Sequence, residues 1–157
     1  MSQAEIDVRG LEEVQRKLEQ VVMDLKGGPI LNAMRNATLL VQGGARRNLK
    51  PWHGPGTGGA DTGRLRASIM PEVVVRTNTI TGVVGSNVKY APYVELGTRP
   101  HFVPAKYIGR WAERHGLGFR GVNVSGKALK FLRRAFDDNK TRIVKLFETA
   151  VGRIVRK

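Results

Sequence analysis

Two kinds of apolar spacing follow one another along this chain, and together they restrict its fold to helices combined with a small antiparallel sheet. Helical spacing occurs in three stretches, over 11–25, 30–45 and 128–155. Between the second and the third, residues 72–77 and 80–85 are rich in Val and Thr and are separated by a short turn. The sequence therefore predicts an α+β fold with two N-terminal helices, an antiparallel sheet built on a β-hairpin, and a long C-terminal helix.

The first two helices are separated by a pair of glycines. Gly27 and Gly28 are expected to end the first helix, and Pro29 suits the first turn of the second. We expect the second helix to end before Pro51, because the residue that precedes a proline resists the helical conformation. Small residues along this helix predict close packing against a neighbour: Ala33, Ala37, Gly44 and Ala45.

The C-terminal helix over 128–155 is expected to bury one apolar face, formed by Phe136, Ile143, Phe147, Val151 and Ile154. Asp137, Asp138 and Asn139 predict a break or a cap near its middle.

The positive charge gathers in the same part of the chain. The protein has 27 Lys+Arg against 13 Asp+Glu, a net charge of +14. Residues 99–157 hold 15 Lys+Arg and 4 Asp+Glu, a net charge of +11. Residues 1–98 hold 12 Lys+Arg and 9 Asp+Glu, a net charge of +3. Since apolar residues run through the C-terminal stretch, we expect this charge to lie on a folded element and to attract acidic or phosphate-rich partners.

A length of 157 residues suits a single domain over 1–157. Within it, 51–63 holds two prolines and five glycines and is expected to be a mobile loop. Residues 99–126 are also broken by prolines and glycines, with one short amphipathic helix expected around Ile108, Trp111, Ala112 and His115.

The sequence contains no recognised catalytic or cofactor-binding pattern. The chain has no cysteine, which removes disulfides, thiolate nucleophiles and Cys-based metal sites. His53, His101 and His115 lack the short spacing of a helical metal site. The glycine-rich run at 54–59 lacks the Lys-Ser/Thr pair and the preceding strand of a phosphate-binding loop. The sequence therefore predicts a protein that is not an enzyme and has no metal or cofactor.

A first motif, Asp61-Thr62-Gly63-Arg64-Leu65-Arg66-Ala67-Ser68-Ile69, joins the glycine-rich loop to the hairpin. Asp61 or Thr62 can cap a turn through a side-chain oxygen, and Gly63 allows an unusual backbone angle. Arg64 and Arg66 flank Leu65 with planar groups able to make paired hydrogen bonds. The alternative is a capped turn with two solvated arginines.

A second motif, Tyr90-Ala91-Pro92-Tyr93-Val94-Glu95-Leu96-Gly97-Thr98, is typical of a short helix ended by glycine. Its aromatic and aliphatic residues predict an apolar cluster in which Glu95 is the single charge. A half-buried carboxylate needs a partner, and Arg64 or Arg66 is the expected one. The alternative is that Glu95 faces water.

In this order, with the hairpin between the motifs and Phe131-Leu132-Arg133-Arg134-Ala135-Phe136 after them, the chain resembles the tailed-phage family of tail-completion or head–tail joining proteins. The resemblance covers nearly the whole chain, and the pair of motifs is more specific than either motif alone. The family residues matched are Asp61, Thr62, Gly63, Arg64, Leu65, Ser68, Tyr90, Ala91, Tyr93, Glu95, Gly97 and Thr98. Residues 99–126 and 54–59 depart from the family pattern as an insertion and a lengthened loop.

The resemblance implies a non-enzymatic virion subunit, assembled in the host cytoplasm, that forms a homo-oligomeric ring, commonly six-fold, at the neck or tail end. Its partners would be further copies of itself, the head–tail connector and the tail tube or terminator proteins, with packaged DNA passing through the channel. Long loops such as 51–63 and 99–126 would be docking arms.

Two other classes of function remain as alternatives. The charge of +14 suits a small nucleic-acid-binding protein, although no helix-turn-helix or aromatic stacking pattern is present. A small hydrolase active in lysis would need a catalytic dyad that the sequence does not contain. We expect no signal peptide in the first ten residues, and no apolar run approaches the roughly 18 residues that span a membrane.

Overall fold

The computed structural model describes residues 27–50, 63–76, 79–116 and 121–156, together with Arg16, Glu19 and Met23. Within these residues the fold is α+β, as the sequence predicted. The helix expected over 11–25, apart from three positions, and the loop expected over 51–63, apart from Gly63, lie outside the described residues.

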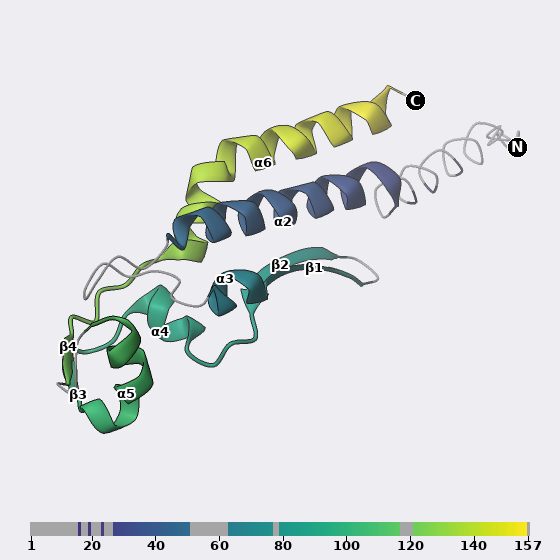
Figure 1. Cartoon of the computed structure of the whole chain (residues 1–157). Coiled ribbons are helices and arrows are strands. Elements are labelled where there is room, and N and C mark those ends of the chain that lie inside the picture. Colours follow the sequence, from purple (N-terminus) through teal and green to yellow (C-terminus); the bar gives the residue numbers. More distant parts are fainter. Residues whose placement is uncertain are drawn as a thin grey trace, which may run out of the picture.

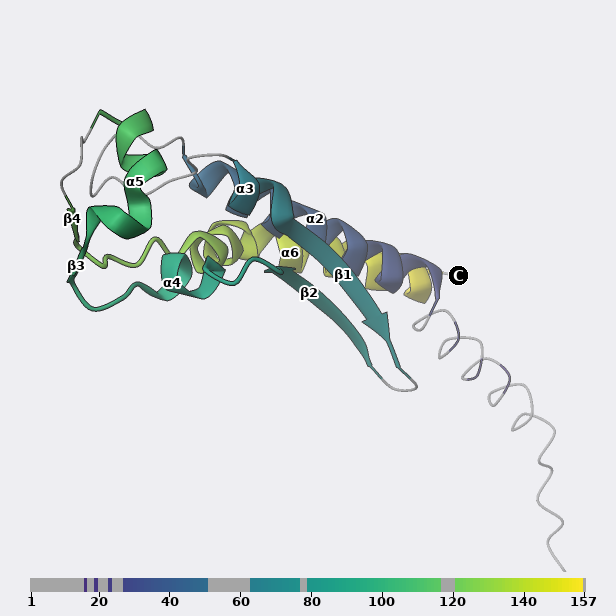
Figure 2. The same cartoon turned by 60° about the horizontal axis from the view of Figure 1, so that its bottom comes forward.

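Helix α2 (Gly28–Asn48) lies between the long C-terminal helix α6 (Phe131–Val155) and a hairpin of strands β1 (Ile69–Val75) and β2 (Ile80–Ser86) (Figures 1 and 2). It has a proline in its first turn and ends ahead of the next proline, which confirms the predicted limits. All four small residues that predicted close packing are buried. The adjacent glycines Gly43 and Gly44, in its last turns, do not interrupt the helix.

The hairpin is antiparallel, with a register that runs from Ile69 opposite Ser86 to Val75 opposite Ile80. Strand β1 starts three residues earlier than predicted and contains Pro71. This proline is tolerated because the sheet has two strands, so each strand is an edge.

Gly82 of β2 lets the hairpin contact α2 directly. A Cβ at this position would lie 2.6 Å from both Met34 Sδ and Thr38 Cγ2. The hairpin therefore rests on α2 at a point where no side chain fits on the strand.

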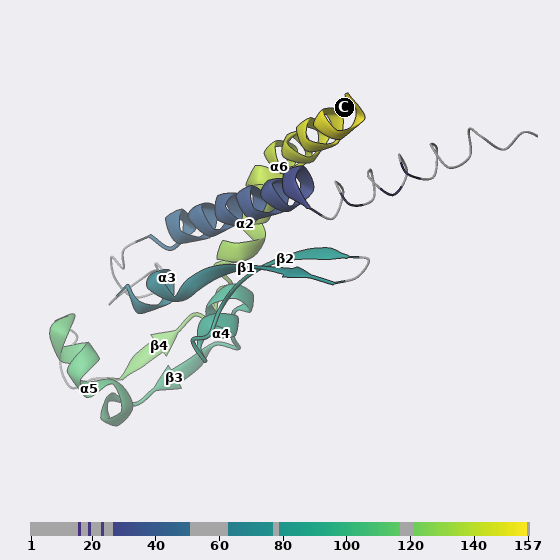
Figure 3. The same ribbon diagram turned by 90° about the vertical axis from the view of Figure 1, so that its right-hand side faces the viewer.

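A small unit at the end of the molecule away from the C-terminus contains β3 (His101–Val103), α5 (Ala105–Arg114) and β4 (Val122–Val124) (Figures 1 and 3). The two strands are antiparallel, with His101 opposite Val124. Helix α5 confirms the short amphipathic helix expected in this stretch. The strands were not predicted, because three residues are too few to show an alternating pattern.

Helix α6 begins at Phe131, not Ala128, and runs without interruption to Val155. The break expected at 137–139 is wrong. Asn139 is 4 % exposed, and its Nδ2 donates to the carbonyl of Ala135 one turn earlier, at 2.8 Å. Its polar group is therefore satisfied inside the helix and does not need to end it.

The apolar face expected on α6 is only partly correct. Phe136 is 50 % exposed and Val151 is 44 % exposed. The residues of α6 that are buried are Phe131, Ala135, Asn139, Ala150 and Ile154. Two of these five, Ala135 and Ala150, are alanines, because α2 and α6 approach closely there and larger side chains stand beside the contact.

The core lies where α2, the hairpin and the start of α6 meet two short helices, α3 (Arg64–Ser68) and α4 (Ala91–Leu96). Its buried members are Val41, Ala45, Leu49, Leu65, Ile69, Val88, Ala91, Phe131 and Ala135. In the described part of the chain, no helix combines the length and the apolar character needed to cross a membrane.

The close approach of α2 and α6 gives a first prediction. A Cβ at Gly44 would lie 3.0 Å from Ala135 Cβ, whereas at Gly43 it would meet only the Arg47 guanidinium, at 3.4 Å. We expect Gly43→Ala to raise the free energy of unfolding by about 0.5–1 kcal/mol, because alanine favours a helix over glycine. Gly44→Ala is expected to be about 1–3 kcal/mol less stable than that variant, because the helices must separate. Urea unfolding of both variants measures the difference, and equal stabilisation would contradict the close packing.

Candidate assembly site

The first motif forms α3 and the start of β1. Gly63 has a φ of +73°, in the left-handed region, and α3 begins at the next residue. Leu65 is 3 % exposed and belongs to the core, whereas Arg64 and Arg66 are exposed. The first two residues of the motif, at positions 61 and 62, lie outside the described residues.

Ser68, the last residue of α3, links this helix to the end of β2 through its hydroxyl. Its Oγ donates to the carbonyl of Leu65 at 2.8 Å and lies 2.7 Å from Ser86 Oγ. Ser86 Oγ in turn accepts the N–H of Val88 at 3.1 Å. In this series of hydrogen bonds each of the two serine hydroxyls donates once and accepts once. Helix α3, and with it the start of β1, is therefore fixed relative to the end of β2.

Two side chains of α2 hold the same junction, and sequence reasoning did not single them out. Gln42 Nε2 and Arg46 Nη2 both donate to the carbonyl of Ile69, at 2.7 and 3.0 Å. They lie one turn apart, so both reach one carbonyl. In the sequence, only their i, i+4 spacing indicates that the two side chains lie on one side of the helix. That spacing does not predict which backbone carbonyl they bind.

The second motif forms α4, which places its apolar residues on different sides. Ala91 is buried in the core, as is Leu65 of the first motif, so the two motifs meet there. Tyr90 is 43 % exposed, Tyr93 64 % and Leu96 76 %. The cluster that the sequence predicted around Glu95 is therefore open, with two large apolar side chains pointing to solvent.

Glu95 is held by the first turn of α6. Its Oε2 accepts the N–H of Leu132 at 2.8 Å, and its Oε1 accepts the N–H of Arg133 at 3.0 Å. The partners of the carboxylate are thus two backbone amides, where the sequence suggested Arg64 or Arg66. A helix N-terminus leaves such amides unpaired and carries a partial positive charge, so a carboxylate satisfies both needs.

Backbone hydrogen bonds reinforce this contact. The N–H groups of Leu129 and Lys130 donate to the carbonyls of Val94 and Glu95, at 2.9 and 3.1 Å. The N–H of Thr98 donates to the carbonyl of Gly126 at 2.9 Å. We call residues 94–98 together with 126–133 the α4–α6 joint.

Helix α6 has no cap of its own. Its N-cap residue, Lys130, has a φ of +50° and makes no side-chain cap hydrogen bond. Such caps are normally Ser, Thr, Asp or Asn at the N-cap position itself. Glu95 supplies this function from a different helix, 37 residues earlier in the chain than Leu132.

The Ser68 hydroxyl and the Glu95 carboxylate, one from each motif, therefore bind other parts of the same chain. Among the described residues, no three His, Asp or Glu side chains gather as metal ligands. The Nδ1 of His101 lies 2.8 Å from the carbonyl oxygen of Arg99, and the His115 ring lies against Trp111 with centroids 4.9 Å apart. Fold and site together define a small α+β protein with exposed apolar side chains on elements that internal hydrogen bonds hold in place.

One comparison identifies the family. The model of the HK97-gp10-like family, described as "Bacteriophage HK97-gp10, putative tail-component", matches residues 11–97. The match covers more than half of the chain, and the chain belongs to this family, as the two motifs indicated. It is a phage tail component, a structural protein of the virion that interacts with other virion proteins. Neither a curated protein nor a solved structure matches the chain.

Proposed function

We propose that this chain forms a homohexameric ring at the neck or tail-completion interface, where it joins the tail to the head connector around the DNA channel. The subunit acts by binding and not by catalysis, and it assembles in the host cytoplasm. One observation carries the proposal. Helix α4 is pinned on its inner side by Glu95 and carries Tyr93 and Leu96, which are 64 % and 76 % exposed, on its outer side.

An exposed apolar surface on a helix that is already held in place, as α4 is, suits assembly for a physical reason. Exposed large apolar side chains that lie together mark sites of contact with other proteins. Because the α4–α6 joint already fixes α4, binding orders little additional chain and loses little conformational entropy. Identical subunits that join through two different surfaces close into a ring when the rotation between them divides the circle evenly.

We further propose that 1–157 is one domain in which 99–126 is an inserted arm for a neighbouring virion protein. The hydrogen bond between Thr98 and Gly126 closes the base of this arm. The family match ends at residue 97, just before it. Phe102 and Tyr107 are 58 % and 72 % exposed on the arm, as expected of a docking element. The proposal extends to 51–63 as a second arm.

Light scattering in high salt after nuclease treatment tests the ring. The expected mass is six times 17.3 kDa, about 104 kDa. The double variant Tyr93→Ser with Leu96→Ser is expected to lower the mass to that of the monomer while the circular-dichroism spectrum stays folded. Tyr107→Ser, on the arm, is the control and is expected to keep the ring. A monomeric parent protein would contradict self-assembly.

A nucleic-acid-binding function is the second candidate, and the net charge of +14 favours it. It predicts binding to duplex DNA that weakens steeply with salt, by a monomer. A ring that binds DNA weakly at physiological salt would exclude this as the main function, whereas a monomer with a steep salt dependence would replace the ring proposal.

A further inference from the structure

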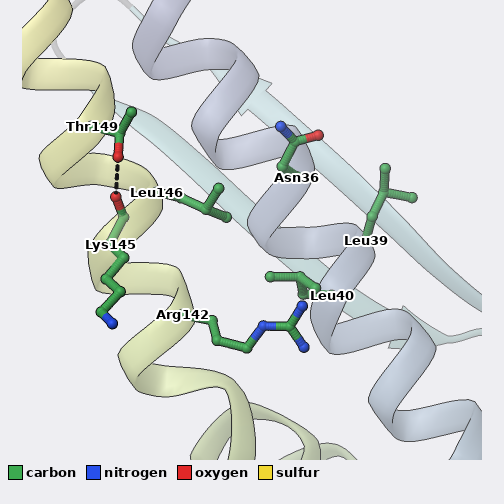
Figure 4. Close-up of a pocket in the computed structure, with 7 residues that line it drawn as sticks. All are labelled: Asn36, Leu39, Leu40, Arg142, Lys145, Leu146 and Thr149. Atoms are coloured by element: carbon green, nitrogen blue, oxygen red, sulfur yellow. Dashed lines mark hydrogen bonds between the residues drawn. The ribbon is translucent and has the colours of Figure 1, made fainter.

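A groove runs along α2 and α6, and every described residue that lines it belongs to one of these two helices (Figure 4). It consists of two hollows of 570 and 320 Å³ that share Asn36, Leu146 and Thr149, so they adjoin. Leu40 and Leu146 point toward the space between the helices (Figure 4). Leu39, on the α2 side, is 52 % exposed. The molecule thus presents an apolar strip of the kind that accepts an amphipathic helix.

The α6 side of this groove is basic. Arg142 and Lys145 line the larger hollow, and Arg153 lines the smaller one. No carboxylate stands among the described residues that line either hollow. The groove therefore suits a helix that combines an apolar face with an excess of acidic residues.

The first 26 residues of this same chain have that composition. They hold six Asp+Glu and four Lys+Arg, a net charge of −2. Residues 27–157 hold 7 Asp+Glu and 23 Lys+Arg, a net charge of +16. Nearly half of the acidic residues of the protein thus stand in its first sixth. Apolar residues recur there every three or four positions: Leu11, Val14, Leu18, Val21 and Leu25.

The described positions of this segment agree with such a face. Arg16, Glu19 and Met23 are helical and exposed. On a helix these three fall on the side opposite to the apolar positions. Fifteen residues of helix, from 11 to 25, span about 22 Å. The groove, lined from Gly28 to Leu40 on α2, spans about 20 Å.

We propose that residues 11–25 of a second copy of this chain occupy the groove between α2 and α6. The segment of the same copy is poorly placed to do so. The N–H of Gly27 donates to the carbonyl of Met23 at 2.8 Å, and α2 begins at Gly28. That hydrogen bond closes a turn at Gly27, directly before α2, whereas a helix that folds back on its neighbour needs a loop of about 2–5 residues.

A segment donated to the next copy is a head-to-tail contact, in which each subunit gives one surface and receives at another. Repeated around a circle, such contacts close a ring. The inference therefore rests on the proposed ring and specifies one of its subunit contacts.

Because the protein contains no cysteine, introduced thiols report this contact alone. Two singly substituted proteins, Lys17→Cys and Asn36→Cys, are mixed and treated with a short bismaleimide. Position 36 lines both hollows, at the middle of the groove. The expected product runs at twice 17.3 kDa, about 35 kDa, on a denaturing gel. The control pairs Lys17→Cys with Val144→Cys, which is 48 % exposed on α6 but does not line the groove.

Adding Leu18→Glu to the Lys17→Cys protein is expected to reduce the cross-linked fraction roughly tenfold or more, because a charge replaces a leucine that the proposed contact buries. Cross-linking of the control pair to the same extent would overturn the inference. So would internal cross-linking of one chain that carries both thiols, with no product between chains. A hexamer by light scattering with no cross-linking would refute the docking and leave the ring standing, whereas a monomer would refute both.

Discussion

Replacing Glu95 with alanine is expected to lower the free energy of unfolding by about 2 kcal/mol, at the upper end of what loss of a helix cap costs. The carboxylate binds two amides of α6, at 2.8 and 3.0 Å, and no residue at the N-cap position replaces it. Its removal leaves both amides without this acceptor, that of Leu132 in a half-buried place, and also removes a negative charge from the positive end of α6.

Urea unfolding of three variants tests this cap. Glu95→Gln keeps an acceptor oxygen but loses the charge, so its stability should fall between those of the parent and of Glu95→Ala. Glu72→Ala removes an exposed carboxylate from β1 and should change stability by less than about 0.5 kcal/mol. If Glu95→Ala matched Glu72→Ala, the cap would be refuted. Combined with Arg66→Ala, the effect of Glu95→Ala should be additive, because the arginine is not its partner.

The fold was predictable wherever an element is long enough to show its period. Helices α2 and α6 each span several turns and bury one side, so their apolar spacing is visible in the sequence. Strands β3 and β4 have three residues each and show none. The buried face of α6 was misjudged because large residues were assumed to be the buried ones, whereas at Gly44 the helices are too close for them.

The site was predictable in its residues but not in its contacts. Glu95 stood out because it is the only charge among apolar neighbours, and that environment demands a partner. Side chains such as Arg64 and Arg66 can be read from a sequence. Backbone amides are the same at every position, so which of them is left unpaired depends on where α6 begins and on how the chain reaches it.

Gly126→Ala is expected to lower the free energy of unfolding more than loss of the Glu95 cap does. It also acts at the α4–α6 joint, but by a different mechanism. Gly126 has a φ of +68°, which alanine adopts only with strain of about 1–2 kcal/mol. A Cβ at this position would also overlap the carbonyl group of Thr98. The segment that holds Thr98 must then move away, which breaks the hydrogen bond from Thr98 to Gly126 and draws α4 from the start of α6. We expect a total loss of about 3–4 kcal/mol in the free energy of unfolding.

Gly116→Ala separates the two causes of this loss. Gly116 has nearly the same backbone angle, a φ of +67°, but a Cβ there would meet no atom of the described residues within 4 Å. This variant should therefore show the backbone strain alone, about 1–2 kcal/mol. The difference between the two variants, measured by urea unfolding under identical conditions, is the contribution of contact at the joint. If both alanines cost the same, Gly126 is needed only for its backbone angle, and the close approach of Thr98 does not hold α4 to α6.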